Sequence, residues 1–139
     1  MKSSLIIDLV DEHKQILHFF EEIQKIGLSS EQKFELLLKI KDLLLNHLNK
    51  EDNHLYPPLT DKAKSDSFLQ IKLNTFGTEM DNITAWVNDF YNKYTSPADL
   101  SKPSYPKDIA YFLFTLKNRV MKEEISIYKA YDELNIEKI

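Results

Sequence analysis

The sequence predicts an all-α protein, an up-down-up-down bundle of four helices. Apolar residues recur with a helical period in four segments, and no segment alternates convincingly with period two. The chain has only two glycines, which argues against a barrel of tight turns and against Gly-rich phosphate loops. Its 139 residues suit one compact domain spanning residues 1–139. Short connections between the segments favour a bundle over a helical repeat array.

The first two helices have recognisable ends. The first is expected from about Ser4 to Ile26, with Gly27 as its stop signal. Ser29 and Gln32 have the spacing of a capping box, which predicts the start of the second helix. Proline lacks a backbone donor and disfavours helix in the residue before it, so the pair at 57–58 is expected to end the second helix.

The third helix is expected to start near Ser65–Ser67 and to run to about Tyr94. A proline-containing loop follows it. Ser104 is the expected cap of the fourth helix, and Pro106 falls in its first turn, where a missing N–H is harmless. The apolar face of this helix continues to about Leu134.

Composition excludes several classes of function. Without cysteine there are no disulfides, thiolate metal sites, iron–sulfur clusters or Cys nucleophiles. A net charge of −4 without a basic stripe gives no reason to expect nucleic acid or an anionic membrane as partner. No run approaches the ~20 apolar residues of a membrane span, and early acidic residues argue against a signal peptide, so a cytoplasmic location is expected. No spacing indicates a hydrolase or another enzyme.

Four polar residues interrupt the apolar faces, which indicates a site inside the bundle. At about 100° per residue, His13 and Glu123 lie at the centre of the core faces of the first and fourth helices. His47 and Glu51 are one turn apart on the core face of the second helix. A buried carboxylate is costly unless it is paired or bound to metal. His54 can also face the interior, whereas His18 points elsewhere and is expected to be solvated.

The two halves of the chain resemble each other, which indicates a duplicated helical hairpin. Segment 47–56 matches segment 119–128, and segment 12–16 matches segment 79–83. The matching motifs are His47-x3-Glu51-Asp52-x2-Leu55-Tyr56 with Arg119-x3-Glu123-Glu124-x2-Ile127-Tyr128, and Glu12-His13-x2-Ile16 with Glu79-Met80-x2-Ile83. An imidazole and a carboxylate one turn apart direct two donors toward one ion.

This ordered set of motifs resembles the hemerythrin family, specifically the bacterial hemerythrin-like (HHE cation-binding) domains, over about residues 5–134. The resemblance implies a four-helix bundle, commonly with a non-haem di-iron centre that binds O2 or NO or serves iron handling and sensing. It also places four residues on positions of family ligands. These are His13, His47, Glu51 and Glu123.

Two positions depart from the pattern. Met80 and Arg119 stand where the repeat leads us to expect histidines. Arg119 is the single arginine among the 18 basic residues, which favours a specific partner such as Glu51 or Glu123. A guanidinium cannot ligate a metal, and its charge opposes a second ion. We therefore expect at most one tightly held metal per chain.

Three other residues have open roles. Met80 is expected to fill core space, because its thioether suits hard iron poorly. Glu79 either turns inward as a substitute carboxylate donor or is solvated. His54 is a spare ligand or lies at the rim of the site.

The predicted function is non-haem metal binding, with O2 or NO as candidate ligands, for reversible binding, sensing or iron handling without turnover. Imidazoles and carboxylates favour iron, as one or two ions, and zinc or manganese also fit. One alternative is a metal-free regulatory bundle in which Arg119 pairs with Glu51 and Glu123 and the protein binds a protein partner. Another is a ferritin-like oxidase, because Glu51-x-x-His54 is half of that motif. Its second copy is missing, since Ser126 and Asn82 stand at the required spacing elsewhere.

Overall fold

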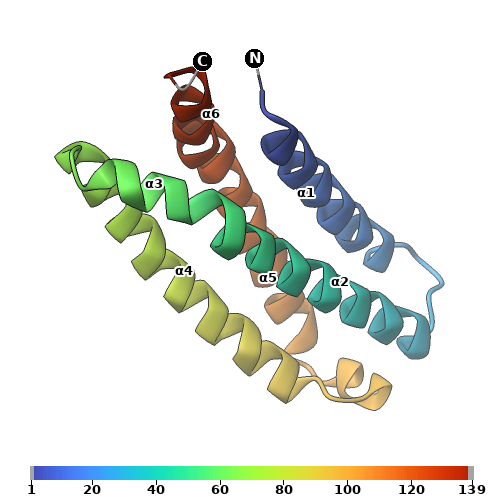
Figure 1. Ribbon diagram of the computed structural model, residues 1–139. Coiled ribbons are helices and arrows are strands. Elements are labelled where there is room, and N and C mark those ends of the chain that lie inside the picture. Colours follow the sequence, from blue (N-terminus) through green and yellow to red (C-terminus); the bar gives the residue numbers. More distant parts are fainter. Residues whose placement is uncertain (1, 138–139) are drawn as a thin grey trace.

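The computed structural model describes residues 2–137, which form the predicted four-helix bundle without a β-strand in that range (Figure 1). Two of the four bundle helices are continuous paths that contain a π-helical turn. In chain order the elements are α1 (Ser4–Ile23), α2 (Ser30–Lys50), η1 (Glu51–Leu55), α3 (Tyr56–Ala63), α4 (Ser67–Lys93), η2 (Pro97–Ser101), α5 (Tyr105–Lys122), η3 (Glu123–Ile127) and α6 (Tyr128–Glu137). The second bundle helix is α2–η1–α3 and the fourth is α5–η3–α6.

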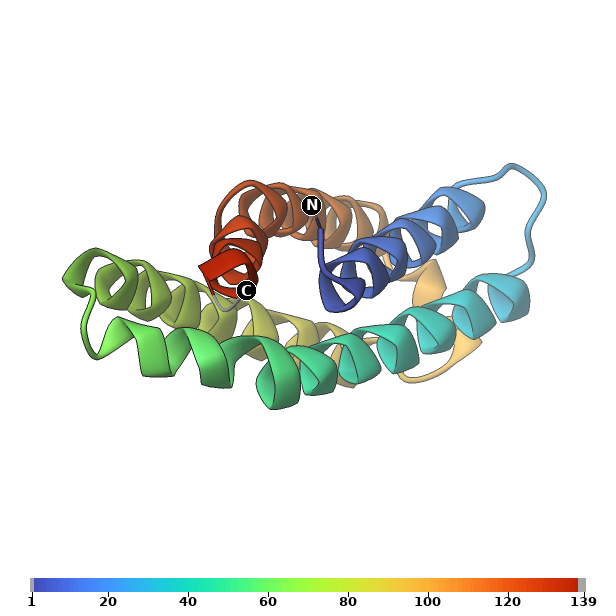
Figure 2. The same ribbon diagram turned by 45° about the horizontal axis from the view of Figure 1, so that its top comes forward.

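Neighbouring bundle helices pack as antiparallel pairs. α1 packs on α2, α3 packs on α4, and α1 and α3 also contact the fourth bundle helix. The two views show α6 ending beside the start of α1 (Figures 1 and 2). There the Ser3 N–H donates to Asp132 Oδ1 over 2.9 Å. None of the described helices has the length and apolar character that a bilayer span requires.

The first turn between helices follows the sequence signals. α1 ends at Ile23, three residues before the expected Ile26, which is fully exposed. Gly27 has a φ of +93°, the left-handed conformation that glycine adopts readily. The capping box at the start of α2 is confirmed: the Gln32 N–H donates to Ser29 Oγ over 3.1 Å, and the Ser29 N–H donates to Gln32 Oε1 over 2.8 Å.

The prediction that the proline pair ends the second helix is wrong. The helical path continues through Pro57 and Pro58 to Ala63. The reason is the π turn η1, in which the Tyr56 N–H donates to the Glu51 carbonyl. The prolines thus fall in the first turn of a new α-helix, where backbone N–H groups are not needed.

The second half begins at the expected residues but with different caps. α4 starts at Ser67, and Asp66 caps it by accepting from the Leu69 N–H over 3.1 Å. Ser104 precedes α5 as predicted, yet its side chain does not cap the helix. Its hydroxyl bonds the Tyr94 hydroxyl over 2.8 Å instead. Pro106 lies in the first turn of α5, as expected.

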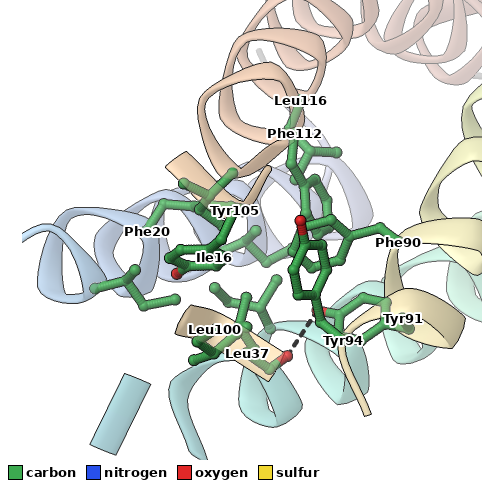
Figure 3. Packing of buried hydrophobic residues seen from close by; sticks show 13 residues of the cluster. Ile16, Phe20, Leu37, Phe90, Tyr91, Tyr94, Leu100, Tyr105, Phe112 and Leu116 are labelled. Atoms are coloured by element: carbon green, nitrogen blue, oxygen red, sulfur yellow. Dashed lines mark hydrogen bonds between the residues drawn. The ribbon is translucent and has the colours of Figure 1, made fainter. Parts of the chain in front are cut away.

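The apolar core consists of two clusters separated along the bundle axis. In the first cluster the Phe112 ring lies 4.9 Å from Phe20 and 5.0 Å from Phe90, between centroids, in edge-on contacts (Figure 3). The Tyr91 hydroxyl donates to the Leu37 carbonyl over 2.7 Å (Figure 3). The second cluster contains Ile6, Leu9, Leu55, Leu59, Ala63, Leu69, Phe76, Ile127 and Tyr128.

A polar layer lies between these two clusters. Along α1, Ile6 and Leu9 belong to the second cluster and Ile16 and Phe20 to the first, with His13 between them. The second and fourth bundle helices follow the same order. The five buried residues of the polar layer are His13, His47, Glu51, Arg119 and Glu123.

Candidate metal centre

The four predicted ligands are all buried in the polar layer. His13, His47 and Glu123 are each 3 % exposed, and Glu51 is 1 % exposed. They come from three bundle helices. Charged groups at this depth are retained only when they are paired or bound to metal, so their partners determine what the layer can do.

A carboxylate holds the outer nitrogen of each imidazole. The Nδ1 of His13 lies 2.8 Å from Glu124 Oε2, and the Nδ1 of His47 lies 2.8 Å from Glu12 Oε1. Lys50 Nζ donates to the other oxygen of Glu12. Since a carboxylate accepts, each Nδ1 carries the proton that it donates, and each Nε2 faces the interior. Carboxylates placed behind imidazoles in this way orient metal ligands and raise their basicity.

The inner nitrogens converge with the two glutamates of the polar layer. Glu123 Oε1 lies 3.4 Å from His13 Nε2, and Glu51 Oε1 lies 3.5 Å from His47 Nε2. Ligand atoms of His13, His47 and Glu123 all lie within 4.8 Å of one another. Two nitrogens and one carboxylate oxygen therefore surround one point, with Glu51 beside it.

Tyr128 reaches the same point from the fourth bundle helix. Its hydroxyl donates to Glu51 Oε2 over 2.8 Å and lies 3.1 Å and 3.2 Å from the Nε2 atoms of His13 and His47. The π turn η3 places it there, because the Tyr128 N–H donates to the Glu123 carbonyl five residues back. Tyr128 therefore bonds across the site, from the fourth bundle helix to residues of the first and second.

Burial and mutual charge set the protonation of the layer. Burial, with the nearby charge of Glu51, raises the pKa of Glu123 above its ordinary value. Burial also acts to raise the pKa of Glu51, but contacts with His47 outweigh it and lower that pKa. Burial acts to lower the pKa of His47, while bonds and charge from Glu51 and Glu12 outweigh it and raise the pKa. The pKa shifts of the layer thus favour the charged forms of His47 and Glu51 and oppose the ionisation of Glu123.

Arg119 is buried, and its contacts are with Phe76 and Glu123 rather than with Glu51. Its Nη1 donates to the Phe76 carbonyl over 3.1 Å, and its guanidinium carbon lies 4.6 Å from the centroid of the Phe76 ring. Its Nε lies 3.7 Å from Glu123 Oε2. The expected pairing with Glu123 is therefore present as a loose ion pair. Within the described chain no ion pair joins Arg119 to Glu51, because the Tyr128 hydroxyl and His47 take that carboxylate.

The roles of Glu79 and Met80, which the sequence left open, can be read from the structure. Neither residue belongs to the group of converging donor atoms. Glu79 is half-buried, and its oxygens lie 3.6 Å from Arg119 Nη1 and from Lys122 Nζ. It is thus neither an inward donor to the cluster nor simply solvated. Met80 is half-buried and lines an apolar pocket with Leu44, Leu48 and other residues of α2 and α4, which agrees with a core-filling role.

His54 does not face the interior, because its side chain is exposed, and of its two open roles that of a spare ligand is therefore excluded. His54 lies in η1. Because the π turn is wider than an α-helical turn, Leu55 and not His54 lies on the buried side of the helix together with Glu51. The ferritin-like motif therefore does not direct both of its residues inward. His18 is 61 % exposed, as predicted.

Sequence reasoning missed Glu12 and Glu124 as partners of the imidazoles. A signal was available, since each directly precedes or follows a predicted ligand within the repeated motifs. Both residues lie at the edge of an apolar helix face. At such an edge the helical period of apolar residues does not distinguish a partly buried carboxylate from a solvated one.

Comparison with known families matches residues 4–131 to the hemerythrin HHE cation binding domain. The match covers nearly the whole chain, so the protein belongs to this family of metal-binding helical bundles. The same comparisons found no match among curated proteins and none among solved structures. The residues present fit a metal ion: two oriented imidazoles and a carboxylate converge in a layer that apolar clusters close on both sides.

Proposed function

We propose that the protein binds a non-haem iron ion through His13, His47 and Glu123, with Glu51 as a further carboxylate. The observation that supports this most is the pair of inward-facing Nε2 atoms, each with a carboxylate 2.8 Å behind its Nδ1. A neutral core histidine needs no such anionic partner, whereas a metal ligand gains basicity and a fixed orientation from it.

The donor chemistry favours iron, with zinc or manganese as the next candidates. The site offers imidazole nitrogens and carboxylate oxygens, and the chain has no cysteine. When bound, iron supplies an open coordination position for a diatomic ligand such as O2 or NO. We propose reversible binding, sensing or iron handling, without turnover and in the cytoplasm.

The chain's own residues prepare the site. Glu12 and Glu124 fix the imidazole planes, and the Tyr128 hydroxyl donates to Glu51 beside both Nε2 atoms. The two apolar clusters exclude bulk water from above and below. These features would keep the donors in place before a metal arrives, which lowers the cost of binding.

A metal-free regulatory bundle that binds a protein partner is the second candidate. The hydroxyl of Tyr128 lies within 3.2 Å of both Nε2 atoms and donates to Glu51, so the layer is well bonded without an ion. This arrangement favours the second candidate because hydrogen-bonded buried networks persist without metal.

Metal analysis separates the two candidates. We expect iron in protein purified without oxygen, and His47→Ala should weaken metal binding about ten-fold or more. His18→Ala is the matched control, because His18 is exposed on α1. A near-ultraviolet oxo-bridge band after exposure to oxygen would indicate two iron ions. If the wild type contains no metal and binds none on titration, the metal-free regulatory bundle would be the remaining candidate function.

A further inference from the structure

Arg119 keeps the contacts that its position in the repeat predicts for a histidine. In the first half His47 contacts Glu12 and lies 3.2 Å from the Tyr128 hydroxyl. In the second half Arg119 occupies the place of His47, Glu79 that of Glu12 and Tyr56 that of Tyr128. Arg119 Nη1 lies 3.6 Å from Glu79 Oε2, and Nη2 donates to the Tyr56 hydroxyl over 3.5 Å.

In each half of the chain a lysine contacts the glutamate that lies beside His47 or Arg119. Lys50 follows His47 by one turn and bonds Glu12, and Lys122 follows Arg119 by one turn and lies 3.6 Å from Glu79. The guanidinium therefore has counterparts of the carboxylate, the lysine and the tyrosine that surround His47. The two sites differ in that Met80, which lines an apolar pocket, takes the place of His13, and in that Arg119 also contacts the carbonyl and ring of Phe76.

Glu123 connects the two halves of the polar layer. Its Oε1 lies 3.4 Å from His13 Nε2, and its Oε2 lies 3.7 Å from Arg119 Nε. Arg119 is 4 % exposed, and its Nε has no hydrogen-bond partner. A guanidinium stays charged at every accessible pH, so this half of the layer always contains a cation.

We propose that the Arg119 guanidinium permanently fills the position of a second metal ion, so that the protein holds one ion and shares Glu123 between that ion and the guanidinium. This inference rests on the proposed metal binding and sets its stoichiometry. The sequence indicated that Arg119 stands at the position of a histidine and opposes a second ion. The structure adds that Arg119 occupies the second half of the site with the partners of a ligand.

The test is a titration of the metal-free protein with Co²⁺, followed by removal of loosely bound ions and elemental analysis. Wild type should hold one ion per chain. Met80→His is the matched control, because it adds an imidazole but keeps the guanidinium, and it should also hold one. The double variant Met80→His, Arg119→His should hold two, since it removes the charge and supplies both imidazoles.

A second measurement does not depend on the variants. Wild type loaded with Co²⁺ and then freed of unbound ions should show the paramagnetic resonance signal of an isolated ion, without coupling between two ions. Two coupled ions in wild type would overturn the proposal about Arg119 and leave metal binding intact. One ion in a folded double variant would also overturn it, because Arg119 would not be what excludes the second ion. Absence of any bound ion would overturn the proposed function itself.

Discussion

The imidazoles of His13 and His47 are suited to ligation because of residues that do not face the ion. Glu124 and Glu12 each hold an outer nitrogen at 2.8 Å, which directs the inner nitrogen toward the convergent donors. The pKa of Glu12 is lowered: burial acts to raise it, but bonds to Lys50 and His47 outweigh that effect. Glu12 is therefore ionised at neutral pH and supplies negative charge behind His47.

Glu12→Gln should weaken metal binding about ten-fold, because removing such a partner costs 10–100-fold and glutamine keeps a hydrogen-bond acceptor. The measurement is a competition titration against a chelator of known affinity. Glu31→Gln is the control, since Glu31 is exposed in the first turn of α2. Equal affinities in Glu12→Gln and wild type would show that the carboxylate has no role in ligation.

Replacing Tyr128 measures how much its hydrogen bond to Glu51 stabilises the polar layer when no metal is bound. Tyr128→Phe leaves the buried Glu51 Oε2 without its hydroxyl donor, which should cost about 1–3 kcal/mol in the free energy of unfolding of the metal-free protein. A bound metal would restore a partner to Glu51, so the loss should be smaller in the loaded protein. Urea denaturation of both forms measures the difference, with Tyr111→Phe, an exposed tyrosine, as control. Equal losses in both forms would mean that Glu51 is not a ligand.

At the scale of elements, the sequence predicted the four helices and the burial of the four candidate ligands, but not the two π turns. A regular α-helix places Tyr128 about 140° from Glu123, off the core face. The turn η3 returns it to that face, and η1 moves His54 outward and lets the chain pass its prolines. Period-based reasoning assumes one constant helical twist, so it fails where the twist changes. The repeat of a Glu and a Tyr five residues apart in both halves was the available clue.

Continuation of the second bundle helix past the prolines has a measurable consequence. Leu59 follows them in α3 and is fully buried in the second cluster. Leu59→Ala should reduce the free energy of unfolding by about 2–5 kcal/mol, the usual cost of such a cavity. Leu45→Ala, at a 51 % exposed position of α2, should cost under about 0.5 kcal/mol. A small loss at Leu59 would indicate that the chain after the prolines is a surface loop.

At the scale of the molecule, the polar layer divides the hydrophobic core. Each cluster draws residues from all four bundle helices, but the layer between them contains two carboxylates, two imidazoles and a guanidinium. Buried polar groups of this kind contribute less to stability than apolar packing of the same volume. A metal ion that pairs with these charged groups would offset the cost of burying them.

Metal binding should accordingly stabilise the whole fold. A ligand at a free concentration of 100 times its Kd adds about 2.7 kcal/mol, which corresponds to a rise in Tm of roughly 10 °C for a chain of this size. A chelator should reverse the rise. In His47→Ala the same metal concentration should raise Tm by about half as much or less, because one of the two imidazoles of the convergent donors is lost and a ten-fold weaker site is stabilised by only about 1.4 kcal/mol. Calorimetry of wild type and variant, each with and without metal, measures both effects. An equal rise in the two proteins would mean that the ion stabilises the fold from the acidic surface and not from the polar layer.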